Sequence, residues 1–483
     1  MNRASNKILT AGVARVDITP PVGFRLQGII RRVEPSVSVH MPLFATGIVL
    51  ADEQTKIAIF DCDLIGLDIP LANEIRQKIA DKLDIDTSNV TVACTHTHNS
   101  PATNRLALGG PHDILPRPGE IEALDSYIRI LVEKLVDAAV EADQSRIPVR
   151  FGSATGLADV NINREEMTDD GRVVVGRNPD GVSDSSVDVL RIDDLSGKAL
   201  AIVCSFAAHP VVMGIDSYMI GPDYPGFVRK RVEQITGATC VFLTGAAGNQ
   251  ATIEFLQDDW YEVDRIGTII GCEVAKVATA IETRPHQIIR ETENSMSSLA
   301  LYKKKYINAP SHNIFDVASR CVTVPLQPLP SLKEATLQFK ECEEQVSNTK
   351  SSDMQGRDLV HAHMMLRWSK NVMQTVLEGI KQPELKFEVV GYRLDDFVLI
   401  SMPGEPFAEI GLAVKRNSKA KSTMFSGYGN GVLAYWPSAD TVLNGGMAVE
   451  ASVKTYDIPS PPTTKTVDII VSEISLMLKS LGL

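Results

Sequence analysis

Short apolar runs alternate with amphipathic segments along the first part of the chain, and this alternation most constrains the fold. The run Val90–Cys94 has the length of a buried strand and follows a segment with helical periodicity at Ile69–Leu83. A sheet of such strands must be covered by helices, because both of its faces are apolar. The other strands expected in this part are Ala45–Ala51, Lys56–Asp61, Val149–Gly156, Val187–Ile192, Ala199–Phe206 and Cys240–Leu243. The other helices expected are about Ile121–Ala142, Phe227–Ile235 and Val263–Ile281. The sequence therefore predicts an α/β fold, a layered mixed sheet with helices on the sheet faces.

A charged, helical stretch interrupts this pattern in the second half of the chain. Residues 330–382 have the periodicity of a helical hairpin, interrupted at Asn348–Gly356. Two further strands, Leu385–Tyr392 and Phe397–Met402, come next, and helices are expected from about Phe407 and near Val467–Leu481. The only long polar or proline-rich connections expected are Asp169–Asp184 and Pro459–Thr464. We therefore predict one domain over residues 1–483 with a helical insertion at 330–382.

Composition and charge exclude several kinds of partner. The formal net charge of −12 argues against nucleic acid or an anionic membrane surface, since both attract a basic footprint. No run of about 18 apolar residues could span a bilayer, and the first 20 residues have no apolar segment typical of a secretory signal. The seven cysteines include no CxxC pair, which suggests reduced thiols in the cytoplasm. We expect a cytoplasmic protein with a small-molecule partner, and self-association as a homo-oligomer is left open.

The clearest local signal is a pair of histidines directly after the strand Val90–Cys94. His96 and His98 are two residues apart, so on an extended segment both side chains point the same way. Imidazole is the commonest zinc ligand, and a strand end holds it rigidly. The alternative is that one histidine is a packed polar residue. By contrast, His361 and His363 lie in a helical pattern, where this spacing turns the side chains apart.

Four other segments carry candidate site residues, each with an ordinary structural alternative. His209 closes an apolar strand, and Asp223 is either the N-cap of the next helix or a carboxylate that orients an imidazole. The turn Gly245–Gln250, with Gly248 and Asn249, is either a tight turn or a nest of backbone amides for an anion. Glu405 is either a helix N-terminal acid or an anionic metal ligand. A loop with Tyr428 and Tyr435 has little core character. Together these residues match a catalytic zinc site with an open position for water.

The order of these motifs resembles the neutral/alkaline ceramidase family, in particular its amino-terminal catalytic domain. The segments concerned are Thr95–His98, Asn161–Arg164, the histidine after a strand, the glycine-rich turn and Met402–Glu405. The opening Ala14–Pro20 and the pair Val39–His40 are similar to that family's amino-terminal segment, and the resemblance covers roughly residues 10–450. Members of the family are zinc amidases. The resemblance implies zinc ligands at His96, His209, Glu405 and Tyr435, with His98 and Arg164 as catalytic groups on the substrate side.

Two departures separate this chain from true ceramidases. The family has a serine in its glycine-rich turn, whereas Gly248 stands at that position here. The family's carboxy-terminal immunoglobulin-like domain is also expected to be absent. Ceramide is therefore expected to be a poor substrate, whereas hydrolysis by a zinc-activated water needs neither feature.

The predicted function is a zinc-dependent hydrolase that cleaves an amide bond, or an ester or lactone, of a small polar substrate. His98, or Asp223 through an imidazole, would carry a proton to the leaving group, and Arg164 would supply a fixed cation. Residues expected to bind the substrate are His40, Gly248, Asn249 and Tyr428. Two alternatives stay open: a metal-dependent hydrolase or isomerase of a carbohydrate derivative, and a non-catalytic metal-binding protein.

Overall fold

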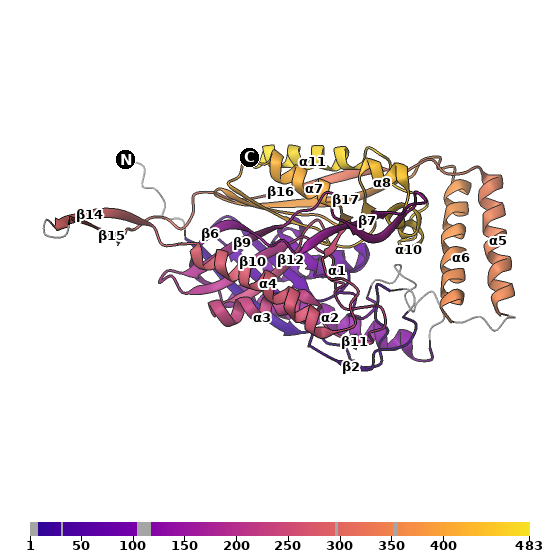
Figure 1. Ribbon diagram of the computed structural model, residues 1–483, viewed down its shortest axis with the longest axis horizontal. Helices are drawn as coiled ribbons and strands as arrows, with labels where there is room; N and C mark the ends of the chain where they lie inside the picture. The colour runs from indigo at the N-terminus through magenta and orange to yellow at the C-terminus, as the bar shows by residue number, and fades with distance from the viewer. Residues whose placement is uncertain (1–7, 30–31, 104–116, 295–297, 351–355) are drawn as a thin grey trace.

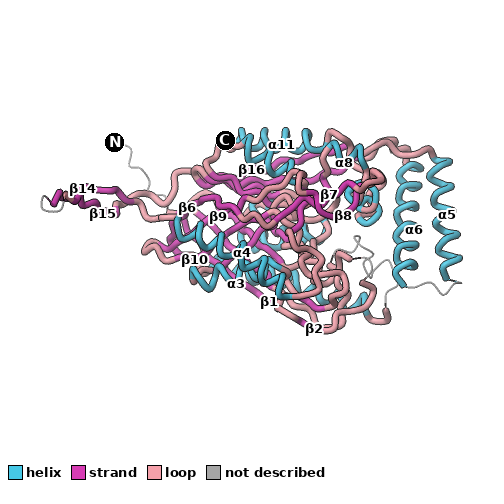
Figure 2. Tube along the Cα trace, in the orientation of Figure 1, coloured by secondary structure: helices cyan, strands magenta, loops and turns pink. Residues whose placement is uncertain are grey.

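A computed structural model of the chain describes residues 8–29, 32–103, 117–294, 298–350 and 356–483 (Figures 1 and 2). The main element is an eight-stranded mixed sheet. The order of its strands is β12 (Thr239–Thr244), β10 (Ala199–Phe206), β9 (Ser186–Asp194), β6 (Ile147–Leu157), β1 (Leu9–Asp17), β3 (Phe44–Ala51), β4 (Lys56–Cys62) and β5 (Val90–Cys94). The outer pairs β10–β12 and β4–β5 are parallel, whereas the inner neighbours are antiparallel.

Four helices cover one face of this sheet. They are α1 (Ile69–Leu83), α2 (Glu120–Gln144), α3 (Tyr224–Thr236) and α4 (Trp260–Ala280). Helices α1 and α2 pack on the β3–β5 side through one apolar cluster, and α3 and α4 pack on the β9–β12 side through another. The periodicity of the sequence correctly predicts all four helices, because each has one apolar stripe that the sheet buries.

The opposite face of the sheet packs against a second sheet of four strands. These are β16 (Phe315–Pro325), β17 (Glu384–Leu394), β18 (Phe397–Ser401) and β20 (Ser422–Ser426). A third apolar cluster fills the space between the sheets, with Ile48 and Leu50 on one side and Tyr392 and Leu399 on the other. Helices α7 (Ala408–Asn417) and α11 (Thr466–Ser480) cover the outer face of the second sheet (Figure 1). The protein is thus a layered α/β structure, as predicted.

The helical insertion expected at residues 330–382 is a hairpin of α5 (Leu332–Lys350) and α6 (Gly356–Leu377), which stands at one end of the molecule (Figure 1). Most of the interruption expected at Asn348–Gly356 lies outside the described residues. Helix α6 is attached to the segment after the short helix α10 (Ser452–Thr455): Trp368 Nε1 donates to the Ile458 carbonyl at 2.8 Å, and Asn371 Nδ2 donates to the Asp457 carbonyl at 2.6 Å. Among the described helices, none is both long and apolar enough to span a bilayer.

The sequence analysis missed the smaller sheets. The polar composition of Asp169–Asp184 predicts a loop, but the segment contains β8 (Val173–Asn178), which pairs with β7 (Asn161–Met167). Strand β7 also pairs with β13 (Gln250–Thr252). A two-stranded ribbon of β14 (His286–Asn294) and β15 (Leu299–Tyr306) projects from the molecule (Figure 2). These strands are polar and largely exposed, so they lack the apolar pattern that identifies buried strands.

Side-chain hydrogen bonds join strand ends that are far apart in the order of the sheet. Thr244 Oγ1, at the end of β12, donates to the Thr95 carbonyl after β5 at 2.8 Å, although β5 and β12 are at opposite edges of the sheet. Ser205 Oγ, on β10, donates to the Phe425 carbonyl of β20 in the second sheet at 3.0 Å. The carboxyl ends of strands from both sheets therefore meet in one place.

A buried ion cluster fixes α7 to the main sheet. Lys415 Nζ lies 2.9 Å from Asp184 Oδ2 and 2.7 Å from Asp188 Oδ2. The two carboxylates are almost fully buried, with side-chain exposures of 6% and 4%. The cluster holds the helix that follows Glu405 against the strand β9.

Removal of this cation should destabilise the whole domain. The change Lys415→Met leaves two buried carboxylates uncompensated, so we expect it to lower the free energy of unfolding by about 3 kcal/mol. Urea denaturation followed by circular dichroism measures this difference. The exposed Lys419, which follows α7, is the control, and Lys419→Met should change the free energy by less than about 0.5 kcal/mol. Equal stabilities of the two variants would contradict a stabilising role of Lys415 between Asp184 and Asp188.

Candidate metal centre

His96 lies in the turn after β5, and its imidazole is oriented by the backbone. Its φ of 67° is left-handed, so the segment is not the extended strand end that the sequence analysis assumed. The backbone N–H donates to the Leu64 carbonyl at 2.9 Å, and ring Nδ1 donates to the Ile65 carbonyl at 2.5 Å. A carbonyl can only accept, so Nδ1 carries a proton, and Nε2 faces the site as the second ring nitrogen, free to bind a metal in the tautomer with that single proton.

His209 follows β10 and is held in the same way. Its backbone N–H donates to the Gln250 carbonyl at 2.9 Å, and Nδ1 donates to the Ala247 carbonyl at 3.0 Å. Burial, together with Arg164, keeps the pKa of His209 well below its usual value. Its Nε2 is therefore also an acceptor, and it lies 3.0 Å from Nε2 of His96.

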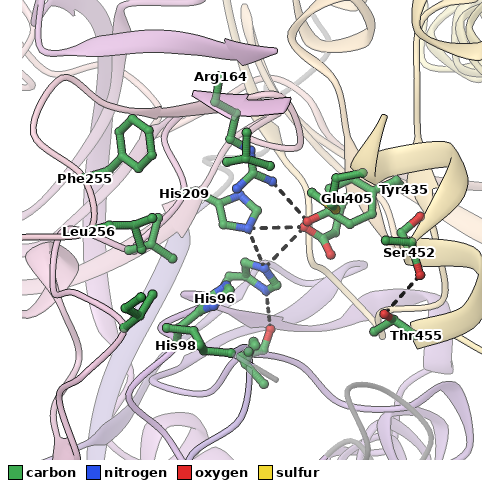
Figure 3. A pocket seen from close by; sticks show the side chains of 18 of the residues that line it. His96, His98, Arg164, His209, Phe255, Leu256, Glu405, Tyr435, Ser452 and Thr455 are labelled. Atoms are coloured by element: carbon green, nitrogen blue, oxygen red, sulfur yellow. Dashed lines mark hydrogen bonds and ion pairs between the residues drawn. The ribbon is translucent and has the colours of Figure 1, made fainter. Parts of the chain in front are cut away.

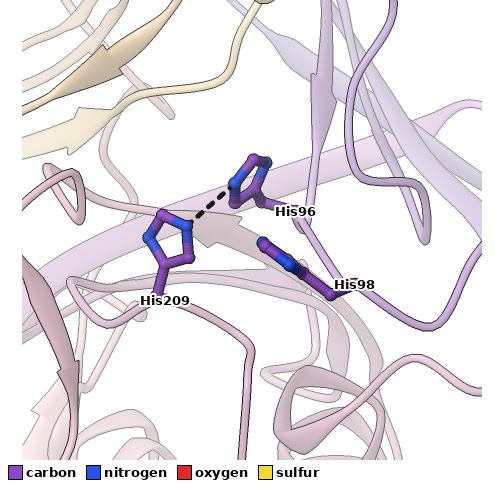
Figure 4. Close-up of side chains that lie close together, drawn as sticks. All are labelled: His96, His98 and His209. Atoms are coloured by element: carbon purple, nitrogen blue, oxygen red, sulfur yellow. Dashed lines mark hydrogen bonds between the residues drawn. The ribbon is translucent and has the colours of Figure 1, made fainter. Parts of the chain in front are cut away.

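His98 completes a cluster of three imidazoles (Figure 4). One ring nitrogen from each of His96, His98 and His209 lies within 4.8 Å of the others. Neither ring nitrogen of His98 has a hydrogen-bond partner in the described part of the chain, and a β-carbon on Gly28 would lie only 2.3 Å from its Nδ1. The sequence analysis thus expected the right pair of histidines to face one site, although for a reason that does not hold at His96.

Glu405 adds a carboxylate to the imidazole cluster. It follows β18 in the short strand β19 (Glu405–Pro406), and its side chain is 2% exposed. Oε2 lies 3.3 Å from His96 Nε2 and 3.5 Å from His209 Nε2, and it accepts no hydrogen bond from a described residue. Burial alone would raise the pKa of Glu405, but His96 and the hydroxyl of Tyr456 outweigh it and hold the pKa below its usual value.

Tyr435 lies beside Glu405 because β19 pairs with β21 (Tyr435–Trp436) in parallel register. Its hydroxyl accepts a hydrogen bond from Arg164 Nη2 at 3.0 Å, and the guanidinium lies 5.9 Å from the ring centroid. Arg164 also donates to the Gly248 carbonyl through Nη2 at 2.7 Å and Nε at 3.2 Å. These bonds fix the cation of Arg164 next to the imidazole–carboxylate cluster.

The cluster lies at the end of a cavity of about 300 Å³ (Figure 3). The polar end is formed by the three histidines, Glu405, Arg164, Tyr435 and Tyr456. The walls are mainly apolar, with two hydroxyls, and include Ile29, Ile65, Val175, Val211, Ile215, Phe255, Leu256, Met447, Ser452 and Thr455. The cavity therefore offers a small apolar compartment that ends in polar and basic groups.

Five residues of the predicted site do not line this cavity, and two of them, Asp223 and His40, have other structural partners. Both carboxylate oxygens of Asp223 accept backbone N–H groups, from Val212, Met213 and Tyr224, so Asp223 is the N-cap of α3. Burial raises the pKa of Asp223 to about 6, but its bonds are to backbone and not to an imidazole. His40 stacks on Trp260, with ring centroids 3.9 Å apart. The catalytic role expected for Asp223 and the substrate-binding role expected for His40 do not fit these positions.

Three other residues expected to bind the substrate instead support the cluster from behind. Tyr428 is fully buried, with its ring centroid 4.3 Å from that of His96. Asn249 accepts the backbone N–H of Ala408 at 2.8 Å through Oδ1, which fixes the start of α7. Gly248 donates its N–H to the Pro406 carbonyl at 2.8 Å and has no room for a side chain. The missing side chain at Gly248 lets the glycine-rich turn lie directly against the segment that carries Glu405.

The sequence analysis missed Tyr456, whose hydroxyl donates to Oε1 of Glu405. It also missed the apolar walls and the hydroxyls of Ser452 and Thr455. Ser452, Thr455 and Tyr456 have the i, i+3, i+4 spacing of one helix face, which is the only signal that the sequence offers. That spacing alone cannot show that the face points to Glu405, because the two segments are 51 residues apart.

The donor atoms of the cluster fit a transition metal. With each Nδ1 bonded to a backbone carbonyl, the Nε2 atoms of His96 and His209 face each other, and a carboxylate oxygen without a hydrogen bond lies next to them. Three acceptors this close repel one another unless a cation lies between them. Two imidazoles and a carboxylate are one of the common protein donor sets for catalytic zinc. Tyr435 and His98 are the nearest candidates for a further ligand.

The structure is that of a layered α/β protein with an imidazole–carboxylate cluster at its strand ends, and comparisons with known proteins show what it is similar to. Residues 9–244 match the family described as neutral/alkaline non-lysosomal ceramidase, N-terminal. The match covers just under half of the chain, so residues 9–244 are similar to this family. Neutral ceramidase B of Dictyostelium discoideum is 28% identical over 218 residues, which are 42% of this chain and 28% of that relative. Neutral ceramidase A of the same organism is 31% identical over 151 residues, 29% of this chain and 19% of the relative. The matched region thus spans less than a third of either relative.

Solved structures of ceramidases have the same fold over nearly the whole chain. The crystal structure of neutral ceramidase from Pseudomonas aeruginosa matches with a TM-score of 0.67 at 15% identity, over 98% of this chain and 74% of the other. A structure described as ceramidase complexed with C2 matches with a TM-score of 0.66 at 14% identity, over 99% of this chain and 75% of the other. The similarity of fold therefore extends well beyond the region of sequence similarity.

The position of Gly248 gives a test of how the centre is assembled. A β-carbon there would lie 2.6 Å from the Glu405 carbonyl oxygen and 3.0 Å from that of Pro406. Gly248→Ser should therefore push the Glu405 segment away and weaken metal binding, with a loss of stability of about 1–3 kcal/mol. Competition with a chelator measures the affinity.

Gly171→Ser is the control for this substitution. A β-carbon at Gly171 meets nothing within 4 Å, so the variant reports only the strain of its φ of +81°. If Gly248→Ser binds metal as tightly as Gly171→Ser, then close contact at Gly248 is not needed to position Glu405.

Proposed function

We propose that the protein is a zinc-dependent hydrolase that cleaves an amide bond. The observation that carries this proposal is the 3.0 Å approach of two Nε2 atoms, with Oε2 of Glu405 at 3.3 and 3.5 Å from them. In this proposal His96, His209 and Glu405 hold the zinc, and Tyr435 is the fourth protein ligand.

Two observations support zinc as the metal and hydrolysis as the reaction: the donor set and the names of the relatives. Imidazole and carboxylate donors suit zinc, but the same set also occurs in non-haem iron enzymes. The relatives are named ceramidases, and a ceramidase hydrolyses an amide, which needs no redox metal. This favours zinc, which, when bound, polarises a carbonyl and lowers the pKa of a water molecule to about 7.

The other steps of hydrolysis are assigned to Arg164, Tyr456 and His98. Arg164 is held by the Gly248 carbonyl and by Tyr435, so its charge is fixed where a carbonyl oxygen gains negative charge during attack. The hydroxyl of Tyr456 donates to Oε1 of Glu405, so the other carboxylate oxygen, Oε2, faces the imidazoles. His98 lines the cavity, and burial keeps the pKa of its imidazole well below the usual value, so the neutral ring is suited to take a proton from the attacking water and pass it to the leaving amine.

The cavity walls suggest a substrate with an apolar part. Its volume of about 300 Å³ is at the lower end of the range of small-molecule sites, which is roughly 300–1,000 Å³. Walls such as Val211, Phe255 and Leu256 would bury a short acyl or alkyl group, and they suit a polyol poorly. We therefore propose a small amide with a short apolar group, in place of the small polar substrate suggested by the sequence, and we do not favour a carbohydrate.

The roles of His96 and His98 are separated by metal content. His96→Ala removes a ligand, so we expect loss of bound zinc and of activity. His98→Ala should keep its zinc and still lose on the order of 10²–10⁴-fold in turnover, as is usual for a general acid or base. Elemental analysis and amide hydrolysis measure the two effects. His361→Ala, at an exposed position on α6, is the control and should change neither. Equal zinc loss in the first two variants would make both histidines ligands.

Substrate size gives an independent test. In a series of amides with increasing acyl length, kcat/KM should rise while the added methylenes still enter the cavity, because each is worth about 1 kcal/mol or more of binding. It should then fall, and long-chain ceramide should be a poor substrate. If long-chain ceramide is hydrolysed as fast as the best short amide, the proposed substrate class is wrong.

A further inference from the structure

Tyr456, the residue that orients Glu405, lies directly after a very short helix. Its hydroxyl donates to Oε1 of Glu405, and Oε2 then faces the imidazoles of the centre. Helix α10, which precedes Tyr456, has only four residues. A helix of one turn is not stable by itself. The position of the Tyr456 hydroxyl therefore depends on what holds the turn in which it lies.

The backbone of this turn has a conformation that needs support. Asp457 has a φ of 53°, in the left-handed region, which disfavours residues that have a side chain. The turn closes on α10, because the Ile458 N–H donates to the Val453 carbonyl at 2.9 Å. Val453 and Ile458 are both buried in the apolar cluster on the outer face of the second sheet. The core thus fixes one side of the turn.

Helix α6 of the hairpin holds the other side of the turn and lies beside α10 (Figure 1). Asn371 Nδ2 donates to the Asp457 carbonyl at 2.6 Å, and Trp368 Nε1 donates to the Ile458 carbonyl at 2.8 Å. The two donors are three residues apart, so they project from one face of α6. They bind the carbonyls of the two residues that directly follow Tyr456. Two side chains of one helix therefore fix the backbone next to the residue that orients Glu405.

The same helix also contacts two segments that form the cavity wall. Met364 Sδ lies 4.0 Å from the hydroxyl of Thr455, which lines the cavity. Val360 and Met364 pack with Val33, four residues after Ile29, which is another residue of the wall. The hairpin is therefore connected to the site from two directions.

We propose that Trp368 and Asn371 are positioning residues of the metal centre. They hold the Tyr456 hydroxyl on Oε1 of Glu405, and Oε2 thereby stays in place for the metal. Residues that orient a metal ligand from behind are commonly worth about 10–100-fold in metal affinity. The inference rests on the metal binding of the proposed function and not on amide hydrolysis.

A double-mutant cycle with zinc affinity as the readout tests this inference. The variant Trp368→Phe, Asn371→Ala keeps an aromatic ring on α6 but removes both donors to the turn, so zinc affinity should fall about 10-fold. Tyr456→Phe should lower the affinity by at least the same factor, because Glu405 loses its hydrogen bond. In the Tyr456→Phe background, loss of the two donors should change the affinity by less than about 2-fold, since both changes act through one contact. Competition with a chromophoric chelator measures each affinity.

Other variants separate positioning from a loss of stability. Ile270→Val shortens a buried side chain of α4 and lowers the stability of the core, but it should leave zinc affinity unchanged. The single variants Trp368→Phe and Asn371→Ala should each show part of the fall, so the test does not depend on the folding of a multiple variant.

Hydrogen exchange adds a readout that does not depend on which metal is bound. The N–H groups of Tyr456 and Ile458 are hydrogen-bonded within the turn, to the carbonyls of Ser452 and Val453. In the full chain as purified, they should exchange at least about 10-fold faster when both donors of α6 are removed, because the turn then opens more readily. In Ile270→Val they should exchange as in the wild type.

Unchanged zinc affinity in the α6 variant, or a fall that adds fully to that of Tyr456→Phe, would overturn the proposal. Exchange at Tyr456 and Ile458 that stays at the wild-type rate would overturn it as well. A wild type that binds no transition metal would refute the proposed metal centre and this inference together. A wild type that binds zinc but hydrolyses no amide would refute the proposed reaction alone.

Discussion

Two backbone carbonyls, those of Ile65 and Ala247, determine the chemistry at the centre of this protein. Each accepts the Nδ1 proton of a histidine, so the Nε2 lone pairs of His96 and His209 point at one another across 3.0 Å. Such an arrangement is unfavourable without a cation, and the carboxylate of Glu405 beside it makes the need greater. A bound cation would interact with all three of these donor groups at once.

The packing of the two sheets brings His96, His209 and Glu405 together. His96 and His209 follow strands of the main sheet, and Glu405 follows β18 of the second sheet, so the two sheets must pack in one register for the three residues to meet. The apolar cluster between the sheets supplies that register, and hydrogen bonds such as Thr244 to Thr95 and Ser205 to Phe425 fix the strand ends. The absence of a side chain at Gly248 lets the glycine-rich turn lie directly against Glu405. The geometry of the metal centre therefore depends directly on how the two sheets pack.

Much of the fold and part of the site could be predicted from the sequence. The features that could not be predicted depend on contacts between distant segments. Seven of the eight strands of the main sheet, all except β1, and the helices that cover the sheet follow from apolar periodicity, which is a local signal. His96, His98, His209 and Glu405 were found because each follows an apolar strand, and strand ends of an α/β sheet meet at one edge. Arg164 and the role of Tyr435 came only from the family resemblance. Nothing local reveals that Tyr456 contacts Glu405, that Asp223 caps a helix rather than contacting an imidazole, or that the cavity walls are apolar, because these depend on long-range packing. The β14–β15 ribbon escaped prediction because it has no buried face.

The central claim is that the imidazoles and the carboxylate share one metal ion, and X-ray absorption at the zinc edge tests it most directly. The account predicts that the purified, zinc-loaded protein shows a first shell of nitrogen and oxygen at about 2.0–2.2 Å, with the outer-shell scattering typical of at least two imidazoles. A shell with sulfur at about 2.3 Å, or one of oxygen alone without imidazole scattering, would contradict it.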